Sequence, residues 1–96
     1  MTAYLIAQLT ITDPAGFDAY RQVVPPVIAA HGGRYLARGG AVTRLEGEPG
    51  GPRIIVLEFA DKAAAEGFYN SAEYQKILPL RLRAAGGSVF IVEGCV

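Results

Sequence analysis

The chain has 96 residues, of which 51% are hydrophobic, and its nine basic and nine acidic side chains give no formal net charge at pH 7. At about 100–200 residues per domain, this length predicts one domain spanning residues 1–96, and the hydrophobic content excludes a disordered chain. The charge balance argues against nucleic acid as a partner and against a polybasic membrane anchor, and no apolar run approaches the roughly 18 residues of a membrane span.

Residues 4–11 combine apolar and β-branched side chains and predict a strand. Asp13 and Pro14 then give the N-cap and first-turn signals of a helix, whose apolar positions recur at helical spacing as far as residue 31. Because a proline removes a backbone donor and clashes with the preceding turn, Pro25-Pro26 predicts a kink or a restart within this helix.

Residues 34–38 predict a second strand, which Gly39-Gly40 interrupts and residues 41–45 resume. A glycine pair within a strand pattern indicates a bulge or a close approach of two backbone segments. Residues 47–52 contain three glycines and two prolines, which predict an irregular exposed loop. Such a loop could cover a pocket or wrap around a partner subunit.

Residues 54–59 form the clearest strand pattern of the chain. Asp61 opens a short helix, Ser71 caps another that Gly86-Gly87 ends, and residues 88–93 predict the last strand. The resulting order is β-α-β-β-α-β, with the second helical part in two pieces. In fewer than about 100 residues this order predicts an α+β, ferredoxin-like sandwich, with an antiparallel sheet and the helices on one of its faces.

The strand patterns predict that one copy of the chain cannot bury all of its apolar surface. Helices on one face leave the other face open, yet residues 54–57 and 89–92 are apolar at both alternating positions, as are residues 5–7. Exposed apolar surface costs about 25 cal/mol per Å², so we expect a symmetric homodimer that buries the open sheet face. The alternative is a monomer with an exposed apolar face.

Several short motifs occur in an order that is specific for one family. They are Asp13-Pro14, Tyr20-Arg21, Ala30-His31-Gly32-Gly33, Arg38-Gly39-Gly40, Leu45-Glu46-Gly47, residues 55–59, residues 68–75, Leu80-Arg81 and Val92-Glu93-Gly94. Over nearly its whole length the chain resembles domain-of-unknown-function family 1330, in the dimeric α+β barrel superfamily, and departs from it at Pro79. The resemblance implies that architecture. Superfamily relatives include cofactor-independent monooxygenases, muconolactone isomerase-like enzymes, haem-handling proteins and stress-response proteins, whereas the family itself has no assigned reaction.

His31 and Glu58 are the catalytic candidates. His31, the single histidine, lies on the apolar stripe in the last turn of the first helix. It is either an acid or base of a pocket, or a packed side chain that closes the helix. Glu58 stands between two apolar residues of the strongest strand, where carboxylates are rare unless they are paired.

Arg81 is the candidate anchor for an anion, because it shares a helical stripe with Tyr74 that must face the sheet. A buried guanidinium needs a partner, and Glu58, Glu93 or a bound anion could supply it. If Glu58 is the partner, the pair is structural; otherwise Arg81 is available to bind a carboxylate or enolate. We expect Arg81 and His31 to face one pocket on the same side of the sheet.

The remaining ligand-binding candidates are Tyr20, Tyr69, Tyr74, Arg38 and Gln8. Tyrosines suit a pocket with an apolar body and a few polar contacts, although each could equally pack in the core. Gln8 would be unusual in a dry core. Arg38 could reach the rim of a pocket or a dimer contact, or protect an edge strand.

The sequence predicts no metal site and no cofactor. One histidine and the distant Cys95 are too few for zinc, and neither a P-loop nor a dinucleotide-binding glycine motif occurs. A lone thiol fits a reducing cytoplasm, and residues 1–13 lack the basic region of a signal peptide.

Two functions remain open at this point. The first is a cytoplasmic homodimer with a sheet–helix pocket for a small, partly apolar, anionic molecule, and with cofactor-independent acid/base, isomerase or monooxygenase-like chemistry. The second is a non-catalytic dimeric binding or stress-associated module, whose polar core residues only satisfy one another.

Overall fold

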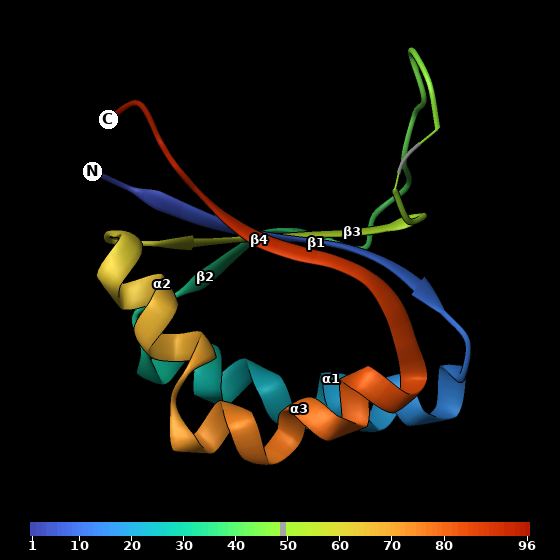
Figure 1. Ribbon diagram of the computed structural model, residues 1–96, viewed down its shortest axis with the longest axis horizontal. Coiled ribbons are helices and arrows are strands. Elements are labelled where there is room, and N and C mark those ends of the chain that lie inside the picture. Colours follow the sequence, from blue (N-terminus) through green and yellow to red (C-terminus); the bar gives the residue numbers. More distant parts are fainter. Residues whose placement is uncertain (49) are drawn as a thin grey trace.

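The structure, a computed structural model that describes residues 1–48 and 50–96, contains four strands and three helices within those residues. In chain order they are β1 (Ala3–Ile11), α1 (Pro14–Ala30), β2 (Arg34–Arg38), β3 (Arg53–Phe59), α2 (Lys62–Tyr69), α3 (Ala72–Ala84) and β4 (Ala85–Glu93). The strands pair in the order β2-β3-β1-β4, and neighbouring strands are antiparallel. Figure 1 shows the three helices together on one face of this sheet. The expected ferredoxin-like α+β fold is confirmed.

Each helix begins where a short polar side chain caps it, as the sequence predicts. The side chains of Asp13, Asp61 and Ser71 accept hydrogen bonds from the backbone N–H groups of Gly16, Ala64 and Tyr74, at 3.2, 2.8 and 3.1 Å. These contacts satisfy donors that have no partner inside the helix, and so fix where each helix starts.

The helix α1 is one continuous element that contains Pro25 and Pro26. Of the two expected outcomes at these prolines, the restart is therefore wrong, and the kink stays a prediction. Val24 and Ile28 lie buried on the same side of α1. Their packing holds the helical course across a site where two backbone donors are missing. In the same way, α3 contains Pro79 without ending there.

Residues 41–45 were expected to continue the second strand, and this is also wrong, because they belong to an irregular connection between β2 and β3. Gly39 turns the chain with a positive φ of 73°, and its N–H donates the final hydrogen bond of this edge to the carbonyl of Ile54 at 2.9 Å. The connection then leaves the sheet on the side away from the helices (Figure 1). Pro49, part of the loop expected over residues 47–52, lies outside the described residues.

The strand β4 begins at Ala85, directly after α3, so Gly86 and Gly87 form part of the strand instead of a helix end. Gly87 has a φ of 141°, and a Cβ atom at this position would overlap the carbonyl oxygen of Gln8 on β1. The absence of a side chain at Gly87 therefore allows β4 to pair closely with β1.

The core lies between the sheet and the helices. Alternate residues of β1 face the helices and are buried, namely Ala3, Leu5, Ala7 and Leu9. A row of aromatic rings continues through this layer, with centroid distances of 5.5 Å for Phe59–Phe68, 4.6 Å for Phe68–Tyr74, 6.4 Å for Tyr74–Tyr20 and 5.7 Å for Tyr20–Phe17. These rings connect β3, α2, α3 and α1 into one packed unit.

The opposite face of the sheet presents apolar side chains outward. Ile6 pairs with both Val56 and Phe90 in the sheet register, and Phe90 and Val92 are 43% and 45% exposed. We call this surface the open face. Within residues 1–48 and 50–96, no helix is long and apolar enough to cross a membrane.

Candidate functional site

A cavity of about 40 Å³ lies between the helices and the sheet. Most of its wall is apolar and comes from Leu5, Ala7, Leu9, Phe17, Val24, Ile28, Ile55, Leu57, Phe68 and Val89. Its polar wall consists of three tyrosines, Tyr20, Tyr35 and Tyr74, and of four arginines, Arg21, Arg38, Arg53 and Arg81. Among the described residues, no carboxylate and no histidine lines this cavity.

Arg81 is the most deeply buried of these cations, with 6% of its surface exposed. It lies in the last turn of α3, where the carbonyl end of the helix partly offsets its charge. Its Nε atom is buried and has no hydrogen-bond partner in the described part of the chain, and none of the ion pairs found there includes Arg81. A buried guanidinium in this state is unfavourable unless an anion meets it.

Tyr20 and Tyr74 form a hydroxyl pair in the same cavity, with their oxygen atoms 2.9 Å apart. Burial is the main cause that raises the pKa of Tyr20 far above its ordinary value, Tyr74 adds to it, and the charge of Arg81 acts in the opposite direction. Two hydroxyl groups have two hydrogens, and the hydrogen bond between them uses one. The second hydrogen is therefore available to a third acceptor in the cavity.

Three arginines with more exposed side chains mark the outer end of the cavity, and we call Arg21, Arg38 and Arg53 the mouth cluster. The Arg38 guanidinium lies 4.4 Å from the centre of the Tyr35 ring, and that of Arg53 lies 5.0 Å from the Phe17 ring. Desolvation lowers the pKa of Arg53, the positive charges of Arg21 and Arg38 lower it further, and the nearby Asp18 carboxylate opposes them in part. The mouth cluster is therefore a site of mutual repulsion between like charges.

Glu58 lies on the other side of the sheet. Its neighbours Leu57 and Phe59 face the helices, so its own side chain points to the open face, where it accepts a hydrogen bond from Arg34 Nε at 2.7 Å. Glu58 is thus not the partner of Arg81, and this alternative from the sequence is excluded. Gln8 also lies on the open face, close to Gly50.

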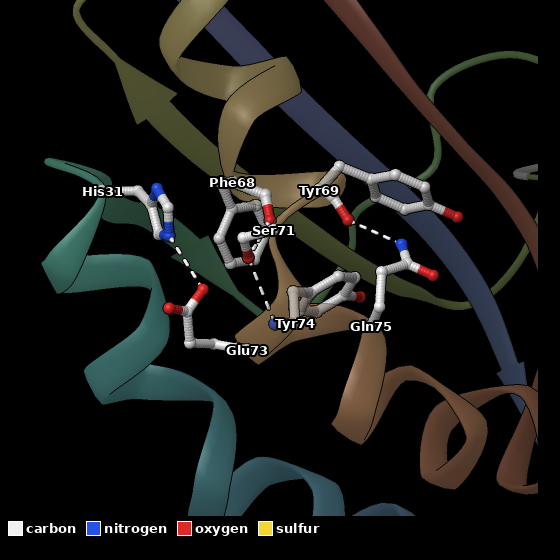
Figure 2. A network of polar contacts seen from close by, with 7 residues as sticks. All are labelled: His31, Phe68, Tyr69, Ser71, Glu73, Tyr74 and Gln75. Atoms are coloured by element: carbon white, nitrogen blue, oxygen red, sulfur yellow. Dashed lines mark hydrogen bonds and ion pairs between the residues drawn. The ribbon is translucent and has the colours of Figure 1, made fainter.

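His31 lies just beyond the end of α1, outside the cavity. Its Nε2 atom is 3.8 Å from Glu73 Oε2, and its ring meets Phe68 edge-on with a centroid distance of 6.1 Å (Figure 2). The expectation that His31 and Arg81 face one pocket is therefore wrong. The reason is helix length: His31 follows Tyr20 by eleven residues, roughly 16 Å along the axis of α1.

Tyr69 also stands apart from the cavity. Its ring packs against Tyr74 with a centroid distance of 5.4 Å, and its carbonyl oxygen accepts a hydrogen bond from Gln75 Nε2 at 2.7 Å (Figure 2). The residue instead lines a second hollow of about 230 Å³ beside β4, together with Glu66 and Phe90.

Of the predicted site residues, the structure thus brings together Arg81, Tyr20, Tyr74 and Arg38. Sequence reasoning missed Arg53 and Tyr35, although the alternation of residues along the strands indicates that both face the helices. Arg53 has the same parity as Ile55 in β3, and Tyr35 pairs directly with Leu57, so both face the helices.

The family model named Domain of unknown function (DUF1330) matches residues 2–95. The chain belongs to this family. No curated protein sequence matches this DUF1330 protein at a significant level.

Solved structures share its fold. The RPA0582 protein of unknown function from Rhodopseudomonas palustris is 16% identical, with a TM-score of 0.74 over 99% of this chain and 83% of that one. SnoaB, a cofactor-independent oxygenase from Streptomyces nogalater, is 12% identical, with a TM-score of 0.64 over 97% and 92% of the two chains. A protein described as an antibiotic biosynthesis monooxygenase is 15% identical, with a TM-score of 0.56 over 100% and 98%. At these identities the likeness concerns the fold.

Proposed function

We propose that this DUF1330 protein binds a small, partly apolar anion in the cavity between its helices and its sheet. Arg81 is the anchor for the anion, and the Tyr20–Tyr74 pair donates the second hydrogen bond. The observation that carries the proposal is the buried guanidinium of Arg81, whose Nε atom has no hydrogen-bond partner in the described residues. An anion in the cavity would satisfy that donor and offset its charge.

The same donors are suited to an oxygen that gains negative charge during a reaction. A guanidinium and a hydroxyl in a cavity with apolar walls would stabilise an enolate or another oxyanion more strongly than water does. This is the part of cofactor-independent isomerase or monooxygenase-like chemistry that the cavity residues support. SnoaB, which has a similar fold, is described as a cofactor-independent oxygenase.

A specific observation supports a second candidate, a non-catalytic binding module. The cavity wall has no histidine and no carboxylate among the described residues, and burial keeps Tyr20 protonated. A proton-abstracting base would therefore have to come from the bound molecule itself. Catalytic roles for His31 and Glu58 stay predictions, and the cavity proposal does not depend on them.

We further propose that two copies pair through the open face, in the cytoplasm. Exposed Phe90 and Val92 beside Ile6 support a symmetric apolar contact, since a patch of this kind is costly in water. The exposed free thiol of Cys95 fits a reducing compartment.

The anchor role is tested by replacing Arg81 with Met, which keeps much of the stem volume and removes the charge. Thermal unfolding is followed with and without butyrate or pentanoate. We expect both to raise the melting temperature of the unchanged protein by mass action, and to have no effect on Arg81→Met. The empty variant should be at least as stable as the parent, because an uncompensated buried charge is gone.

Arg83→Met is the matched control, since Arg83 lies exposed on the same helix. It should keep the response to both carboxylates. The proposal is rejected if Arg81→Met still responds to them, or if the unchanged protein responds to neither.

A further inference from the structure

We propose that the mouth cluster is a second anion subsite, and that the cavity therefore takes a short aliphatic dicarboxylate. One carboxylate would meet Arg81 and the Tyr20–Tyr74 pair, and the other would meet Arg38 and Arg53. This inference rests on the proposed function, because it assigns a ligand class to the same cavity.

The charges of the wall are the first argument. Four arginines line the cavity, and no carboxylate does so among the described residues. Arg21 has a partner nearby in Asp18, whose Oδ1 lies 2.7 Å from its Nη2. Arg38, Arg53 and Arg81 take part in none of the ion pairs between described residues. Asp18 offsets only part of the repulsion that Arg21 and Arg38 exert on Arg53. A single negative charge at Arg81 would leave the remainder in place, whereas a second one at the mouth cluster would relieve it.

Arg53 is also held in position before any ligand arrives. Its guanidinium lies over the ring of Phe17, and its Nε atom is buried with no hydrogen-bond partner in the described chain. Gly39 packs directly on this group, since a Cβ atom there would lie 2.5 Å from Arg53 Cζ. A donor that is fixed in this way loses little conformational entropy when an anion binds.

The spacing of the two subsites favours one molecule over two separate ions. Arg53 rests on Phe17, and the charge of Arg81 acts on Tyr20, which stands one helical turn further along α1. The two rings are 5.7 Å apart between centroids. Most of the cavity wall is apolar, so a chain of methylene groups is the natural link between the two carboxylates.

The volume of the cavity limits how much of such a ligand it can enclose. At about 40 Å³ the cavity is much smaller than one of about 150 Å³ that accommodates benzene. A five-carbon dicarboxylate would therefore extend out of the enclosed space, with its second carboxylate at the partly buried Arg53 and the exposed Arg38.

The test compares glutarate with pentanoate, which have the same number of carbons and differ in the second carboxylate. Binding is measured by isothermal titration calorimetry at fixed ionic strength in a phosphate-free buffer. We expect glutarate to bind about tenfold more tightly, as one additional charge-assisted hydrogen bond predicts. Sulfate, which carries two charges but cannot reach both subsites, should bind more weakly than glutarate.

The double variant Arg38→Gln/Arg53→Gln should bring the affinity ratio of glutarate to pentanoate close to one. Since Arg53 is partly buried, the single Arg38→Gln exchange at an exposed side chain is the second variant, and should lower the ratio partway. Arg83→Gln removes the same charge outside the cavity and should keep the ratio of the unchanged protein.

The outcomes separate the two proposals. If glutarate and pentanoate bind equally and Arg81→Met loses both, the second subsite is rejected and the anion cavity stands. If sulfate binds as well as glutarate, or if Arg83→Gln lowers the ratio as much as Arg38→Gln does, the second subsite is also rejected. If none of the anions binds, or if Arg81→Met binds them all normally, both proposals fall together.

Discussion

Tyr20 on α1 and Tyr74 on α3 are 54 positions apart in the chain, yet their hydroxyl oxygens are 2.9 Å apart in the core. This hydrogen bond ties together α1 and α3, two of the three helices that line the cavity. It is also the only place within the described residues where two tyrosine hydroxyls meet. Loss of either hydroxyl leaves the other buried without its partner.

The first prediction follows from that pairing. Tyr20→Phe and Tyr74→Phe should each lower the free energy of unfolding by about 1–3 kcal/mol, the usual cost of an unsatisfied buried polar group. The double variant should lose clearly less than the sum of the two, because it leaves no orphaned hydroxyl. Urea denaturation of the four proteins measures this coupling, and strict additivity would contradict the pairing.

The second prediction concerns alkaline pH. Burial raises the pKa of Tyr20 in the folded protein above the unfolded value near 10. The folded state then keeps a proton that the unfolded state releases. The contribution of Tyr20 to the free energy of unfolding is therefore complete below about pH 10, and it is lost as the pH rises above that value. Urea midpoints between about pH 9 and 11 should fall less steeply for Tyr20→Phe than for the unchanged protein. Parallel curves would show that Tyr20 titrates normally.

The third prediction concerns Glu58, which lies on the open face and pairs with Arg34. Glu58→Gln should leave the affinity for pentanoate unchanged and should shift the urea midpoint only slightly, because exposed ion pairs contribute little. Calorimetry and urea denaturation measure both quantities. A large loss of carboxylate binding would place Glu58 in contact with the cavity, contrary to the strand parity.

The fourth prediction concerns assembly. Phe90→Lys places a charge in the open face and should convert a dimer into a monomer, as measured by sedimentation velocity at micromolar concentration. Leu82→Lys is the control, since Leu82 is 61% exposed on the helical side of the molecule. If Leu82→Lys dissociates the protein and Phe90→Lys does not, the contact lies on the helices instead.

Local signals in the sequence were enough to predict most of the fold. Asp13, Asp61 and Ser71 cap the helices that they were expected to cap, because an N-cap depends only on residues within one turn. The errors occurred where contacts between distant parts of the chain determine where a helix or strand begins and ends. Packing of Val24 and Ile28 carries α1 through two prolines, and the close approach of Gly87 to β1 draws the glycine pair into β4.

The site was predicted in part for the same reason. The helical stripe correctly placed Arg81 beside Tyr74, because both lie on one helix. Whether His31 and Arg81 share a pocket depends on how the ends of α1 and α3 are placed relative to each other. The spacing of apolar residues along each helix does not give this placement. In the structure, alternation along β3 places Glu58 on the open face. Because β3 is apolar at both alternating positions, its sequence did not show which of its residues face the helices.

The position of the cavity has a consequence for how a paired molecule would behave. The cavity lies on the helical side of the sheet, whereas the proposed contact between copies uses the opposite side. In such a pair the two sheets stand back to back, and each binding site faces outward with its own opening. Saturation should therefore proceed with two equal and independent sites per pair and a Hill coefficient near one. Exchange of the bound molecule would not require the copies to separate.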